Sequence, residues 1–203
     1  MARGRNDEVL LDPVPEFWRQ AAEIEKSLLE WPTWPAPEGV PQGLRIPASR
    51  GQLRTSAAET ISVVVSLREK SGPGLEGVRL RLTVWAFRRE LDVTATLEVP
   101  DNRFVTIARV DAWPSDRHVN TRARRLPALR HLPAIIEGHH VHRFADNARL
   151  GREAFSPHGN LPVAAPIDQQ LRSFRDFVRI VAAEFRIDDL DDIDPPDSWR
   201  MLL

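Results

Sequence analysis

The stretch that decides the fold runs from residue 78 to residue 111 and reads VRLRLTVWAFRRELDVTATLEVPDNRFVTIARVD. Apolar and polar side chains alternate along residues 78–84 and again along residues 91–99. Because successive side chains of a β-strand point to opposite faces, this alternation predicts strands with one buried and one solvated face. Residues 100–102, Pro-Asp-Asn, have turn chemistry, and residues 104–111 resume the strand pattern. We therefore expect successive strands that form an antiparallel meander.

Further elements are predicted on both sides of this stretch. Thr60 to Arg68 is rich in β-branched residues and predicts a strand that precedes the meander. His139 to Phe144 predicts a fifth strand. Asp168 can cap a helix whose residues 171–185 carry one apolar face at spacings of three and four. The sequence thus predicts an α+β fold in which a C-terminal helix covers an antiparallel β-sheet of about five strands.

The N-terminal segment predicts an amphipathic helix. Asp12 can cap this helix, and apolar residues recur at helical spacing from Phe17 to Trp31. We expect the helix to stop at Trp31, since a residue that precedes proline avoids the helical conformation. Pro32 to Gly51 holds five prolines and three glycines, which predicts an extended connector.

These patterns divide the chain into three parts. Residues 1–51 form the N-terminal helix and connector, residues 52–187 form the α+β core domain, and residues 188–203 form an acidic tail with six aspartates. We expect the first helix or the acidic tail to hold a protein partner if the chain works as part of a complex.

The composition excludes several classes of site. The 203 residues include no cysteine, which excludes disulfides, thiolate metal sites and a cysteine nucleophile. With Lys+Arg 28 against Asp+Glu 29, no global field favours nucleic acid. No stretch approaches the roughly 20 apolar residues that span a bilayer, and the N-terminus lacks a signal-peptide pattern. We therefore expect a cytoplasmic protein without a membrane partner.

Histidines are concentrated between residues 109 and 144. Five of the six lie there: His118, His131, His139, His140 and His142. On a strand, His140 and His142 project from the same face and place two imidazoles side by side. His118 and Asp111 can join them from the adjacent loop and strand, so that these four residues are candidate ligands for a divalent metal cofactor.

The segment from residue 112 to residue 137 predicts a long loop with one helical turn near Ala128, because its prolines interrupt any longer helix. Loops of this length in a compact domain are usually functional or disordered. One alternative interpretation makes Asn120 and Asn147 loop residues that tolerate turn dihedrals and nothing more.

Arginines favour a phosphate ligand. Residues 117–152 carry eight arginines against two acidic residues, an excess of six positive charges. A guanidinium group matches phosphate oxygens bidentately, so Arg109, Arg125 and Arg143 are candidate phosphate-binding residues. The alternative is that the loop arginines pair with the acidic tail at residues 188–197.

The same histidines fit acid–base catalysis as well as metal binding. Histidine has an unperturbed pKa of roughly 6.5 and exchanges protons near neutrality. His118, His140 and His142 are therefore candidate catalytic groups of a metal-independent ribonuclease, in which one imidazole accepts a proton and another donates one.

Three short motifs carry a resemblance to a family. Residues 107–111 (I-x-R-V-D), 118–120 (H-x-N) and 140–144 (H-V-H-R-F), followed by an apolar segment and a terminal helix, resemble a bacterial domain of unknown function found in prophages and mobile elements. The resemblance covers roughly residues 78–187 and implies a mobile-element or phage-conflict setting, with no reaction attached. The family follows its H-x-N with Pro-Asp-Gly, whereas residues 121–123 begin a longer arginine-rich insertion here.

From these observations we expect a nuclease-like protein of a bacterial defence, toxin or mobile-element system that acts on RNA or DNA phosphates. The alternative is a binding subunit of a multi-protein defence or toxin–antitoxin complex that has no catalytic activity.

Overall fold

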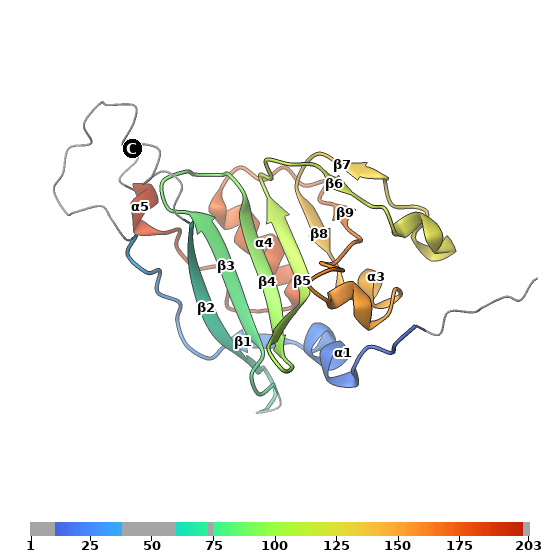
Figure 1. The fold of residues 1–203 in the computed structure, drawn as a ribbon. Helices are drawn as coiled ribbons and strands as arrows, with labels where there is room; N and C mark the ends of the chain where they lie inside the picture. The colour runs from blue at the N-terminus through green and yellow to red at the C-terminus, as the bar shows by residue number, and fades with distance from the viewer. Residues whose placement is uncertain (1–10, 38–59, 73–74, 201–203) are drawn as a thin grey trace, which may run out of the picture.

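The structure, a computed structural model, describes residues 11–37, 60–72 and 75–200, apart from the side chain of Arg125. It is an α+β fold built on a seven-stranded sheet with the strand order β1-β2-β3-β4-β5-β8-β9 (Figure 1). The strands are β1 (Lys26–Leu28), β2 (Thr60–Glu69), β3 (Arg79–Trp85), β4 (Val93–Pro100), β5 (Phe104–Ala112), β8 (His140–His142) and β9 (Ala165–Pro166). The sheet exceeds the predicted five strands because a short edge strand is added at each end.

The predicted meander is confirmed. Strands β2 to β5 pair antiparallel with their neighbours in sequence, and β8 continues the same pattern beside β5. The side chains of residues 93, 95 and 97 in β4 are fully buried, as their alternation predicts. The register of the β4–β5 pairing shifts between Leu97 and Glu98, where the ladder is irregular.

The two faces of the sheet differ in polarity. The apolar side is covered by α4 (Phe174–Phe185), whose residues Phe177, Val178, Val181 and Phe185 are buried, and this helix lies behind the sheet in Figure 1. The other side carries a polar row in which Arg79 and Arg81 both bond the carboxylate of Glu98. The helix begins after Ser173, whose hydroxyl accepts from the amide of Asp176, so the prediction of Asp168 as its cap is wrong.

The N-terminal helix is shorter than predicted. Helix α1 (Glu16–Glu23) ends eight residues before Trp31, and residues 26–28 form β1 at the edge of the sheet. The helical spacing of apolar residues therefore continued by coincidence into an edge strand, in which Lys26 and Leu28 are the buried positions. Trp18 and Ala21 of α1 are buried in the same core as the sheet. The proline-rich connector lies outside the described residues from position 38 onward.

The acidic tail also packs on the sheet. Ile193 and Trp199 belong to the main core, and the indole N–H of Trp199, in α5 (Asp197–Arg200), donates to the carbonyl of Trp85 at 2.7 Å. Both segments that were predicted to serve a partner thus contact the chain's own core. None of the helices in the described ranges is long and apolar enough to cross a membrane.

The remaining elements lie near the end of the sheet that β5, β8 and β9 form (Figure 1). They are β6 (His118–Val119) paired with β7 (Ile135–Ile136), two short 3-10 helices η1 (Ala123–Arg125) and η2 (Pro127–Leu129), α3 (Phe144–Ala148) and η3 (Arg152–Phe155). The helical turn predicted near Ala128 is confirmed as η2.

Lys26 offers a test of how this core tolerates charge. Its side chain has no exposed surface, and burial, with a smaller contribution from the charge of Arg186, lowers its pKa to about 8. Between that value and 10.5, the unfolded chain binds more protons than the folded protein, so stability rises with pH. We expect Lys26→Met to stabilise the protein at pH 7 by about 1–3 kcal/mol and to remove this rise, as measured by urea unfolding at pH 7 and pH 10.

The control for this variant is Lys70→Met, which removes an exposed lysine from the surface ion pair with Asp188. It should leave the pH dependence of the wild type in place. Destabilisation by Lys26→Met at pH 7 would show that the bond from its ammonium to the carbonyl of Ile24 outweighs the cost of burial.

Candidate functional site

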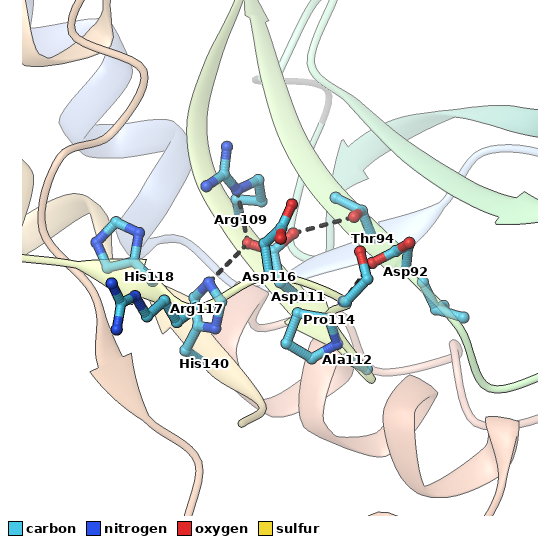
Figure 2. A pocket seen from close by; sticks show the side chains of 12 residues that line it. Asp92, Thr94, Arg109, Asp111, Ala112, Pro114, Asp116, Arg117, His118 and His140 are labelled. Atoms are coloured by element: carbon cyan, nitrogen blue, oxygen red, sulfur yellow. Dashed lines mark hydrogen bonds and ion pairs between the residues drawn. The ribbon is translucent and has the colours of Figure 1, made fainter. Parts of the chain in front are cut away.

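A polar cavity of about 310 Å³ opens on the uncovered face of the sheet, where β4, β5 and β8 lie side by side. Figure 2 shows the side chains that line it. They are Asp92, Val93, Thr94, Arg109, Asp111, Ala112, Pro114, Ser115, Asp116, Arg117, His118 and His140. The sequence-predicted residues Arg109, Asp111, His118 and His140 are therefore neighbours in space.

Strand register explains why these residues meet. Thr94 lies opposite Asp111 in the β4–β5 pairing, and Asp111 lies opposite His140 in the β5–β8 pairing. Arg109 is in the same way opposite His142. Two polar rows therefore cross the sheet, and they face away from α4 because Val110 and Val141 occupy the other face.

Three imidazoles converge at this point. The ring centroids lie 4.7 Å apart for His118 and His142, 5.1 Å for His140 and His142, and 5.2 Å for His118 and His140. One nitrogen from each ring lies within 4.8 Å of the others. His142 has no exposed surface and lies behind the cavity, whereas His118 is half-buried at its wall.

Asp111 is the shared partner of the cluster. Its Oδ2 lies 3.3 Å from Nε2 of His140, 3.2 Å from Nε2 of His142 and 2.8 Å from Nε of Arg109. Its Oδ1 accepts a hydrogen bond from the hydroxyl of Thr94 at 3.0 Å. A carboxylate that is mostly buried in a sheet is thus surrounded by donors and by cationic or titratable groups.

The surroundings shift several pKa values. Burial would raise the pKa of Asp111, but its contacts with His140 and His142 and the charge of Arg109 outweigh burial and hold this pKa well below its usual range. Burial lowers the pKa of His142 to about 4, and burial together with the charge of His140 lowers the pKa of His118. His142 is therefore neutral at pH 7, and its Nε2 accepts from Arg109. Nε2 of His118 donates to Oδ1 of Asn120 at 3.1 Å, because an amide oxygen can only accept.

Two imidazoles are oriented by backbone carbonyls. Nδ1 of His140 lies 2.9 Å from the carbonyl of Gly138, and Nδ1 of His142 lies 2.6 Å from the carbonyl of Leu161. Since a carbonyl oxygen can only accept, each Nδ1 carries the hydrogen. The guanidinium of Arg109 donates to Nε2 of His142 at 2.7 Å and to Oδ1 of Asn160 at 3.1 Å.

Two asparagines hold the chain segment that carries Leu161. Oδ1 and Nδ2 of Asn147 bond the amide and carbonyl of Val163 at 3.0 and 2.8 Å. Asn120 does the same for the amide and carbonyl of Ala164 at 2.8 and 2.9 Å. Both asparagines are buried, so their interpretation as plain loop residues is wrong. The two side-chain amides thus make the hydrogen bonds to Val163 and Ala164 that the backbone of a neighbouring strand would otherwise make.

The predicted phosphate-binding arginines do not stay together. Arg109 lies in the cluster, but Arg143 points to the helix-covered face and forms an ion pair with Glu184 of α4. Arg125 lies in η1, on the loop beyond His118, and its side chain is outside the described part. Arg117, which lines the cavity mouth, was not singled out, although its place directly before His118 was a signal for it.

The alternative pairing of loop arginines with the tail is not what the described residues show. Asp191 and Asp192 pair with Arg179 and Arg175 of α4, and Asp188 pairs with Lys70. Among the described residues, no carboxylate forms an ion pair with Arg117, Arg122, Arg124 or Arg130. These arginines therefore leave a basic surface on the loop beside the cavity. The ion pairs of the tail are exposed and salt-screened.

Residues of the site that sequence reasoning missed are Thr94, Asn160 and the asparagine pair. Thr94 could have been found from strand register, since it is a polar residue opposite Asp111. Asn160 gave no signal, because it comes from a loop more than 50 positions away in sequence from Arg109. His139 lies outside the cluster, and its Nδ1 accepts from the amide of Trp113.

Comparisons with known proteins found no match, whether to protein-family models, to curated proteins or to solved structures. The resemblance to a phage-borne domain of unknown function therefore stays a prediction.

The asparagine pair predicts a specific loss of stability. Asn147→Asp keeps the shape of the side chain but removes its donors to the carbonyls of Val163 and Arg143, and it buries a charge. We expect it to destabilise the protein by about 2–4 kcal/mol, because buried polar groups lose their partners. Chemical unfolding measures this change. The reverse swap at the adjacent, half-buried position, Asp146→Asn, should change stability by less than about 0.5 kcal/mol. Equal effects of the two variants would contradict the role of Asn147.

Proposed function

We propose that the cavity is the active site of an enzyme that cleaves phosphodiester bonds in nucleic acid. The observation that carries this proposal is the meeting of His118, His140 and the buried carboxylate of Asp111 at the wall of an open cavity, beside Arg117. Imidazoles with a lone pair beside a fixed carboxylate are the groups that phosphodiester cleavage uses, either for proton transfer or as metal ligands.

The groups at the cavity have distinct tasks in this proposal. His118 and His140 reach the reacting phosphate, because both line the cavity. His142 has no exposed surface and both of its ring nitrogens are bonded, so it supports the others from behind. Arg109 holds Asp111 and His142 in place, while Arg117 at the mouth is the arginine available to a phosphate oxygen.

Nucleic acid is the proposed substrate because of the loop that follows His118. Arg122, Arg124 and Arg130 lie on this loop without a described acidic partner, and such side chains neutralise the charges of a phosphate backbone. The proposal refines the predicted site: Arg117 takes the phosphate-binding role for which Arg143 was a candidate. A defence, toxin or mobile-element setting is supported only by the resemblance and is part of the proposal on that ground.

The test is incubation of the purified full-length protein with total RNA, single-stranded DNA and plasmid DNA. We expect cleavage of at least one of them, and a loss of activity of about 100-fold or more in His118→Ala, since removal of a catalytic acid–base group typically costs 10²–10⁴-fold. His131→Ala, which removes an exposed histidine from the same loop, should keep full activity.

Two other outcomes would count against the proposal. Cleavage that survives unchanged in both His118→Ala and His140→Ala would come from another site or a contaminant. If a folded wild-type protein cleaves none of the substrates, with or without added divalent metals, the chain is a binding subunit without catalytic activity.

A further inference from the structure

The imidazoles of the histidine cluster face one carboxylate. Nδ1 of His140 and of His142 each donates to a backbone carbonyl, so it is Nε2 of each ring that faces the cluster. Both Nε2 atoms point at the same carboxylate oxygen, Oδ2 of Asp111, from 3.3 and 3.2 Å. These distances from one oxygen to two nitrogens suit the ligands of one cation.

Arg109 is a cation that already contacts the cluster. Its guanidinium donates to Oδ2 of Asp111 and to Nε2 of His142. Among the described residues, no donor is bonded to Nε2 of His140, which faces the carboxylate. The side of His140 and His118, where the cluster borders the cavity, is therefore open to a second cation.

We propose that His118, His140, His142 and Asp111 form a binding site for one divalent transition metal ion of the zinc class. Three imidazole nitrogens with one carboxylate oxygen are the donor set that such ions prefer. Histidine ligands of metals usually donate their second ring N–H to a backbone carbonyl or carboxylate, as His140 and His142 do with Gly138 and Leu161. Thr94 orients the carboxylate from its other oxygen.

To bind an ion, the three histidine nitrogens must move closer together, and the guanidinium of Arg109 must move away from Nε2 of His142. The nitrogens lie within 4.8 Å of one another, whereas bonds of about 2.0–2.1 Å from Zn²⁺ to each nitrogen require a closer set. His118, at the cavity wall, donates through Nε2 to Oδ1 of Asn120, so that it would bind the ion through Nδ1. The guanidinium would leave Nε2 of His142, and Asn160 on an exposed loop already holds it by its other end.

The charge of the cavity agrees with a bound cation. Three carboxylates line it, from Asp92, Asp111 and Asp116, against two guanidinium groups, from Arg109 and Arg117, so that two minus three leaves one negative charge. One divalent ion would change this balance to plus one, which attracts a phosphodiester. This step rests on the proposed function, whereas the argument for the metal itself does not. A metal would supply Lewis-acid stabilisation of the phosphate.

The test measures binding without any substrate. Full-length protein is treated with a chelator, dialysed, and titrated with Zn²⁺ by calorimetry and with Co²⁺ by visible absorption. We expect one ion per chain and a cobalt absorption spectrum of nitrogen and oxygen ligands. His118→Ala and His140→Ala should weaken binding by more than the roughly 10–100-fold that loss of an outer partner costs. His131→Ala should bind as the wild type does.

Arg109→Gln tests the competition between guanidinium and metal. Removal of the adjacent positive charge should tighten Zn²⁺ binding several-fold, and weaker binding would overturn the placement of the ion beside Asp111. Substoichiometric binding by wild type, or binding unchanged in both histidine variants, would overturn the metal site.

The two proposals fail separately. Nucleic-acid cleavage that resists chelation, together with no metal uptake, would leave the enzyme and remove the metal. Stoichiometric metal binding without cleavage of any nucleic acid would leave the metal site and remove the proposed substrate.

Discussion

An ionised carboxylate held largely away from water is the constraint on which this site depends. Asp111 lies within the central strand pairs of the sheet, where an unpaired charge would cost several kcal/mol. The strand register meets that cost with neighbours on both sides, the hydroxyl of Thr94 on β4 and the imidazole of His140 on β8. Arg109 adds a full positive charge two positions along the same strand. Polar residues on β4, β5 and β8 thus satisfy one another's hydrogen bonds and charges. Together they form one wall of the cavity.

The parts of the fold that the sequence predicted are those governed by local periodicity. The alternation along residues 78–111 reports the pleat directly, since one face of each strand meets α4 and the other does not. The spacing of His140 and His142 is a consequence of the same pleat, which is why their shared direction could be expected. At the edges of the sheet periodicity misled: three residues at β1 are too few to distinguish a strand from the end of a helix.

The remaining features of the site come from contacts between residues distant in sequence. Arg143 follows His142 directly, but successive residues of a strand point to opposite faces. The side chain of Arg143 therefore points toward α4, where it pairs with Glu184. The buried asparagines could not be distinguished from turn residues, because only the folded chain brings their partners Val163 and Ala164 beside them. Sequence distance, rather than residue type, separates what was predicted from what was missed.

Asn120 has one more consequence for the protein. Its amide donates to the carbonyl of Ala134 and its side chain to that of Pro133, so the chain leaves and re-enters the domain at nearly one point. The arginine-rich residues 121–132 are therefore a loop whose two ends are bonded together, while Ala123 and Leu129 anchor its middle in a small core with Val163. Because the exposed side chains between these anchors take no part in that core, they can change in charge at little thermodynamic cost. The charge of this surface can therefore vary while the neighbouring His118 stays in place.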